Sequence, residues 1–200
     1  AIGPGAGQKG TAACDSVFIG GNAGSESRGK YGVMVGHNAG YYRCTGDSNV
    51  LIGYYSGLGS SSDISVNTGS NNIFMGKYSG CRLTSGSSNV FIGLSAGGGD
   101  CVTGSHNVFL GSNAGIGVTT AGCNVFIGKD SGRSVKCSGE NIFIGCYAGK
   151  FSLQGGVIIG AGAGKCHKVG GSNVFIGDIA GQGNSGSFTN SVSTQQSTFV

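Results

Sequence analysis

The sequence predicts an all-β protein, a glycine-rich parallel β-solenoid of about ten coils with about 17 residues each. Three observations support this fold class. A short apolar triplet recurs along the chain, a glycine closes each triplet, and a second glycine follows four residues later in every copy. Short repeats of this kind bury their apolar residues by stacking on their neighbours, which is the principle of a solenoid.

The apolar triplets are the expected strands. Each places branched residues around a larger one, as in Val125-Phe126-Ile127, and such runs favour strands. The closing glycines lie 16, 17, 23, 17, 18, 17, 17, 15 and 17 residues apart, at Gly20, Gly36, Gly53, Gly76, Gly93, Gly111, Gly128, Gly145, Gly160 and Gly177. A half copy precedes them at Ile2-Gly3, so we expect a repeat domain over residues 1–181, with ten full coils and one half coil, and a cap or tail over residues 182–200.

The glycine four residues after each closing glycine predicts a corner of the coil. Glycine at a fixed position indicates a positive φ or a backbone approach too close for a Cβ atom. The residue before it is always alanine or serine, as at Ala96 and Ser131, which indicates a narrow interior.

An asparagine precedes most triplets, and its recurrence predicts a ladder of amides. Stacked one coil apart, such amides can form hydrogen bonds along the solenoid axis. The expected Asn ladder consists of Asn49, Asn72, Asn89, Asn107, Asn124, Asn141 and Asn173. Ser16, Gly32 and Gly156 replace asparagine in three coils.

The middle residue of every triplet is large and apolar, and the flanking residues are apolar too. Because strand side chains alternate between faces, both faces of each strand need burial. We therefore predict that the middle column is an association stripe between chains; the alternative is that it points into a self-contained coil. The column consists of Phe18, Met34, Leu51, Phe74, Phe91, Phe109, Phe126, Phe143, Ile158 and Phe175.

Composition excludes several classes of function. The net charge is +4, only 10% of residues are charged, and the basic residues are scattered over many copies, which favours a solvated surface over a nucleic-acid interface. No apolar run approaches the roughly 18 residues of a membrane span. The histidines are isolated and the acidic residues do not recur at one position of the repeat, so we expect no metal, no cofactor and no catalytic site.

Eight cysteines lie mostly between the triplets, which favours disulfide staples and an oxidising compartment. Two pairs lie in connections of adjacent coils, Cys81 with Cys101 and Cys123 with Cys137. Free buried thiols are the alternative. Metal binding is disfavoured because the sequence has no C-x-x-C spacing.

The segments Ser88–Gly97 and Ser172–Gly181, with the pattern Ser-Asn-Val-Phe-Ile-Gly-x-x-Ala-Gly, resemble the head repeats of trimeric autotransporter adhesins. They also resemble repeats in phage and virus tail-fibre proteins. The resemblance implies a left-handed β-roll, three chains side by side and a role in attachment.

From these observations we expect a structural or adhesive fibre segment, located outside the cell, on a cell surface or on a virion. Its partners would be copies of itself, as a homotrimer or head-to-tail homopolymer, and a receptor or glycan. One alternative is a filament subunit, in which residues 197–200 complete the half coil at residues 1–3 of the next copy. Another is a carbohydrate-binding solenoid, with a site near the insertion at residues 58–70 and stacking tyrosines at Tyr42, Tyr54, Tyr55, Tyr78 and Tyr147.

Overall fold

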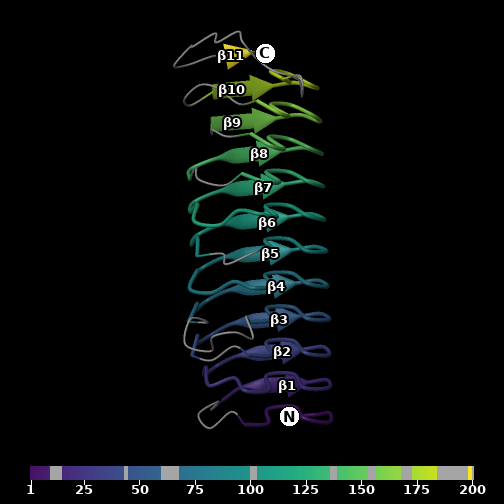
Figure 1. Ribbon diagram of the computed structural model, residues 1–200, viewed down its shortest axis with the longest axis vertical. Coiled ribbons are helices and arrows are strands. Elements are labelled where there is room, and N and C mark those ends of the chain that lie inside the picture. The colour runs from purple at the N-terminus through teal and green to yellow at the C-terminus, as the bar shows by residue number, and fades with distance from the viewer. Residues whose placement is uncertain are drawn as a thin grey trace.

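The computed structural model describes residues 1–9, 15–42, 45–59, 68–99, 103–135, 139–152, 156–167, 173–183 and 198–199. Across these residues the chain forms eleven strands and no helix. The strands form one sheet in sequence order, and they are stacked along a straight rod with the two termini at opposite ends (Figure 1). The predicted fold class, a parallel β-solenoid, is therefore confirmed.

Each of the first ten strands corresponds to one apolar triplet. Eight of them have the expected bounds, and β9 and β10 begin one residue earlier. The strands are β1 (Val17–Ile19), β2 (Val33–Val35), β3 (Val50–Ile52), β4 (Ile73–Met75), β5 (Val90–Ile92), β6 (Val108–Leu110), β7 (Val125–Ile127), β8 (Ile142–Ile144), β9 (Gly156–Ile159), β10 (Asn173–Ile176) and β11 (Thr198–Phe199).

Neighbouring strands pair in parallel and in register, so that equivalent residues of successive coils form columns. For example, Phe91 lies opposite Phe74 on one side and Phe109 on the other. The columns have the spacing of hydrogen-bonded strands, about 4.8 Å. Because of this register, the residues at each position of the repeat form one column that runs along the rod.

The glycines at the corners are required by close contacts. At Gly111, which has a φ of +137°, a Cβ atom would lie 2.6 Å from the carbonyl oxygen of Gly128 in the next coil. At Gly115, with a φ of +63°, it would lie 2.3 Å from the ring of Phe109. The second glycine of the repeat therefore makes room for the large middle residue of its own coil.

The middle column forms the core of the solenoid, so the prediction that it is an association stripe is wrong. All ten side chains are at most 6% exposed. Each coil contributes its large middle residue to the interior, together with buried alanine or serine residues such as Ala114 and Ser131. Leu83, Val118 and Val135 are further buried aliphatic residues in the coils of Phe74, Phe109 and Phe126. Five phenylalanines (Phe74, Phe91, Phe109, Phe126 and Phe143) stack with centroids 4.7–4.9 Å apart and planes within 12° of parallel.

The amide ladder runs through six consecutive coils, from Asn49 to Asn141. In each step the amide nitrogen donates to the oxygen of the preceding asparagine, at 2.8–3.1 Å. Asn173 lies outside this run because the equivalent residue of the coil between is Gly156, which has no side-chain amide. Only the backbone nitrogen of Gly156 donates to Asn141. The side-chain nitrogen of Asn173 lies 3.5 Å from His167 Nε2. The predicted seven-residue ladder is thus a six-residue ladder with one separate member.

The last strand extends the sheet near the C-terminal end. β11 pairs in parallel with β10, with Thr198 opposite Val174 and Phe199 opposite Phe175. Residues 184–197 and Val200, the rest of the expected cap or tail apart from residues 182–183, lie outside the described part of the chain.

Candidate functional site

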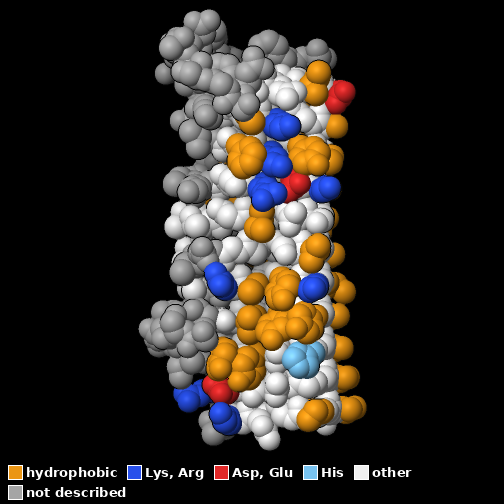
Figure 2. Space-filling model, turned by 45° about the vertical axis from the view of Figure 1, so that its right-hand side comes forward, with side chains coloured by type: hydrophobic (Ala, Val, Ile, Leu, Met, Phe, Trp, Pro, Cys, Tyr) orange, Lys and Arg blue, Asp and Glu red, His pale blue; other side chains and the backbone are white. Residues whose placement is uncertain are grey.

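Two outward columns of aliphatic residues form the main candidate interaction surface, which we call the aliphatic face. They are the first and third residues of each triplet, and they flank the buried middle column. Several are 37–47% exposed, among them Val17, Ile19, Ile73, Met75, Ile92, Ile142 and Ile176. Hydrophobic side chains follow the right-hand edge of the rod in the space-filling view (Figure 2). The surface available for association is therefore formed by the flanking columns and not by the phenylalanine column.

The geometry of the aliphatic face suits contact with another flat surface. It comprises twenty side chains on ten strands in register, and it is about 48 Å long at the strand spacing of about 4.8 Å. All twenty are valine, isoleucine, leucine or methionine, with no charge among them. Soluble monomers rarely expose a continuous apolar patch of more than a few hundred Å².

A cluster of aromatic side chains lies on the turns that follow β2, β3 and β4. His37 stacks on Tyr54 with centroids 5.6 Å apart, and Tyr55 stacks on Tyr78 at the same distance. The Tyr54 and Tyr55 rings meet edge to face at 4.4 Å. Lys77 Nζ lies 5.6 Å from the Tyr54 centroid and 5.3 Å from that of Tyr78.

Of the five stacking tyrosines predicted from the sequence, the structure brings three together in this cluster. Tyr42 packs instead on Tyr41, with centroids 4.0 Å apart, and Tyr147 lies among lysines farther along the rod. Burial and the neighbouring Tyr55 raise the pKa of Tyr54. A hydrogen bond with Tyr42, together with burial, raises the pKa of Tyr41 to about 12. Both phenols therefore stay neutral at physiological pH.

A shallow, open pocket lies beside this cluster, between the turns of three coils. It is lined by Tyr78, Cys81, Arg82, Ser95, Gly98, Gly99 and Ile116. The insertion at residues 58–70, which we expected to hold a carbohydrate site, falls largely outside the described residues, because residues 60–67 are among those not described.

The candidate disulfides each have one member within the described residues. Cys81 and Cys123 carry free thiols, as do Cys146 and Cys166, whereas Cys101 and Cys137 lie outside the described part. Burial raises the pKa of the Cys81 thiol. Because Cys81 and Cys123 are free, neither Cys81–Cys101 nor Cys123–Cys137 is bonded in this structure, and both pairs stay predictions from the sequence.

Within the described ranges, no three histidine, cysteine or acidic side chains are grouped in a way that would hold a metal ion. The same residues contain no helix with the length and apolar character that crossing a bilayer demands. No family model, curated protein or solved structure matches the chain.

The structure contains a second polar ladder, which was not predicted from the sequence. Six residues before the closing glycine, side-chain oxygens accept hydrogen bonds from the backbone of the preceding coil. The Ser70 oxygen accepts from Asp47 N at 3.0 Å, Ser87 from Ser70 N at 3.1 Å and Ser105 from Ser87 N at 3.0 Å. In the sequence, this ladder is visible only as small polar residues six positions before the closing glycines. The many other serines between the triplets hide this pattern.

Proposed function

We propose that this chain is a structural segment of an attachment fibre, in which three copies pack side by side through their aliphatic faces. The observation that carries the proposal is the continuous aliphatic face on the outer side of the sheet. Burying it between chains removes apolar surface from water, which contributes about 25 cal/mol per Å².

Three chains suit this face better than two because of its shape. The face is long and only two residues wide, so three such strips can converge on one axis and cover each other along their whole length. The repeat is in register over ten strands, so an interface formed at one coil continues at the next. The resemblance of the repeat to adhesin heads and tail fibres also implies three chains side by side.

The location outside the cell and the role in attachment belong to the same proposal. A rod of stacked coils is a rigid spacer, and its turns present aromatic side chains to the solvent. The even number of cysteines supports an oxidising environment. In this proposal the fibre meets its target through the turns, while the aliphatic face holds the chains together.

The mass of the purified protein in solution, from light scattering behind a sizing column, tests the proposal. One chain weighs 19.7 kDa, so we expect three times that mass for the native protein. Replacing Ile92, Leu110 and Ile127 together by threonine keeps the branched shape that strands favour and removes apolar surface. We expect this triple variant to run as a single chain.

The matched control replaces Leu94, Ile116 and Ile179 by threonine. These aliphatic residues lie on the turns, and Leu94 and Ile179 are exposed. The control variant should keep the three-chain mass. A single-chain mass for the native protein, or equal effects of the two triple variants, would contradict the proposal.

A second candidate is a filament that grows by head-to-tail stacking of rods. It is favoured by β11, which pairs with β10 in parallel and continues the registered columns by one further strand. Sheet edges at the ends of a solenoid template further pairing unless they are covered.

A further inference from the structure

A group of basic and aromatic side chains lies on the turns after β7, β8 and β9, away from the aliphatic face. We call it the basic cluster, and it consists of Lys129, Arg133, Tyr147, Lys150, Phe151 and Lys165, with Asp130 beneath them. Figure 2 shows basic and hydrophobic side chains gathered on the turn face toward the C-terminal end of the rod. Along the sequence these basic residues are scattered over several copies, but the stacking of the coils brings them together.

The repeat itself aligns three of the cations. Arg133, Lys150 and Lys165 each lie five residues after the closing glycine of their coil, so they occupy one column in successive coils. Neighbours in such a column are about 4.8 Å apart at their backbones. Lys129, one residue after its glycine, lies beside this column.

Three ammonium groups converge on one tyrosine ring. The centroid of Tyr147 is 4.8 Å from Lys150 Nζ, 5.6 Å from Lys165 Nζ and 5.9 Å from Lys129 Nζ. No two of these charges can then be more than about 12 Å apart, so their fields reinforce each other at low ionic strength, where the Debye length is longer than about 10 Å.

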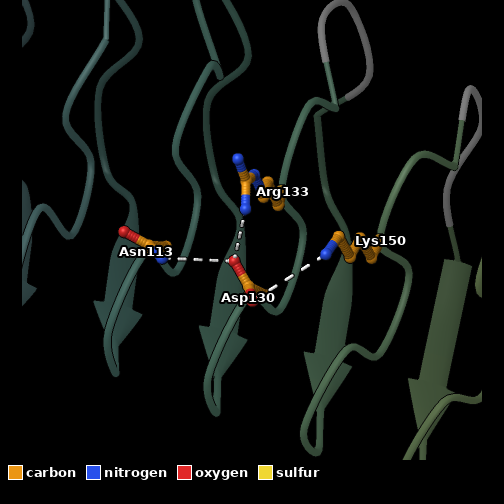
Figure 3. Close-up of polar contacts among 4 residues, drawn as sticks. All are labelled: Asn113, Asp130, Arg133 and Lys150. Carbon is orange, nitrogen blue, oxygen red and sulfur yellow. Dashed lines mark hydrogen bonds and ion pairs between the residues drawn. The ribbon is translucent and has the colours of Figure 1, made fainter.

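Asp130 neutralises only part of this charge. Its carboxylate accepts a hydrogen bond from Arg133 Nη1 at 3.1 Å and lies 3.8 Å from Lys150 Nζ, and Asn113 Nδ2 donates to it at 3.3 Å (Figure 3). Four cations against one anion leave a net charge of +3. In the described part of the chain, neither Lys129 nor Lys165 has a carboxylate at ion-pair distance.

The cluster also has an apolar component that reaches the solvent. Phe151 is 43% exposed, and Lys150 Nζ lies 5.2 Å from its ring centroid. An exposed phenylalanine in a cluster with a net positive charge fits a ligand that combines a flat apolar surface with negative groups. The pyranose rings of an acidic polysaccharide offer both, since their C–H faces pack on aromatic rings and their sulfates or carboxylates accept hydrogen bonds from ammonium groups.

We propose that the basic cluster binds an acidic polysaccharide, with Lys129 and Lys165 contacting its anionic groups and Phe151 supporting one sugar ring. A single-stranded nucleic acid is favoured less, because it needs successive open aromatic platforms and here the ring of Tyr147 is surrounded by ammonium groups. The inference deepens the attachment role proposed above by naming the class of target.

Binding of a size-fractionated heparin oligosaccharide to the full chain tests this inference, with titrations at several salt concentrations. The informative variant carries Lys129→Gln and Lys165→Gln, and we expect its affinity to fall about tenfold at low salt, with a shallower salt dependence because two ionic contacts are lost. Phe151→Ala should weaken binding severalfold and leave the salt dependence unchanged.

The matched control carries Lys9→Gln and Lys30→Gln, which remove the same charge from exposed positions near the other end of the rod. It should bind as the native protein does, and a neutral dextran fragment should not bind. Equal losses in the two lysine variants, no heparin binding at low salt, or tighter binding of an oligothymidylate of equal charge would each overturn the inference. The mass of every sample is measured in the same buffer, so failure of chain association is distinguished from failure of this site.

Discussion

Asn107 is held by a complete set of hydrogen bonds. Its amide nitrogen donates to Asn89 Oδ1 at 3.1 Å and to the Ala121 carbonyl at 3.0 Å. Its oxygen accepts from the backbone nitrogen of Asn124 at 3.0 Å and from the Asn124 amide at 2.9 Å. A side-chain amide has two N–H donors and one oxygen with two lone pairs, so nothing is left unsatisfied in this buried site.

Replacing Asn107 by alanine should therefore cost about 3 kcal/mol or more in the free energy of unfolding, because several buried polar groups lose their partners at once. Asn107→Ser should cost less, since a hydroxyl oxygen can still accept from the next backbone nitrogen, as Ser16 Oγ accepts from Gly32 N at 3.0 Å. Urea unfolding followed by circular dichroism measures both. Equal destabilisation by the two substitutions would show that the backbone contact contributes nothing.

At the level of the coil, the phenylalanine stack forms the centre of the core, and other buried side chains such as Val118 complete it. Each ring of the central stack packs between two others, and alanine and serine residues close the opposite wall. Phe109→Ala should destabilise the protein by about 3–5 kcal/mol, because the cavity cannot collapse between two fixed coils.

Phe109→Leu is the matched substitution, and it should cost less than about 1.5 kcal/mol because Leu51 fills the equivalent place in another coil. Thermal unfolding of both variants, monitored at the same protein concentration, provides the comparison. A loss for leucine as large as that for alanine would mean that ring stacking, and not the filled volume, stabilises the core.

The strand bounds followed from the sequence, but the direction of the side chains did not. Alternation predicts that the flanking residues of a triplet share a face opposite the middle one, and this holds in β1 to β10. It does not say which face is inside, because both are apolar. The decisive signal was Gly115 and its equivalents: the missing Cβ atom makes room for the ring of Phe109.

On the scale of the whole rod, the features that matter for function arise from register between coils. Lys129 and Lys165 are 36 residues apart in the chain, yet both approach Tyr147. The coils differ in length, so a fixed period of 17 does not bring Lys150 and Lys165 into one column, whereas counting from each closing glycine does. The candidate site was therefore contained in the sequence, but only after the coils were aligned by their glycines.

The free edge of β11 is where a further strand could continue the sheet. Among the described residues, β11 has a strand neighbour on the β10 side only. If rods join head to tail, deleting Gln195–Val200 removes β11 and should abolish threads seen by electron microscopy, while the lateral mass of the particles stays the same. The variant with threonine at positions 92, 110 and 127 of the aliphatic face should lose the lateral association and keep the head-to-tail contact, so it should form thin threads one chain wide. Unchanged threads after the deletion would contradict head-to-tail stacking and leave β11 with a capping role, because a strand that covers the edge of β10 protects the solenoid from further pairing.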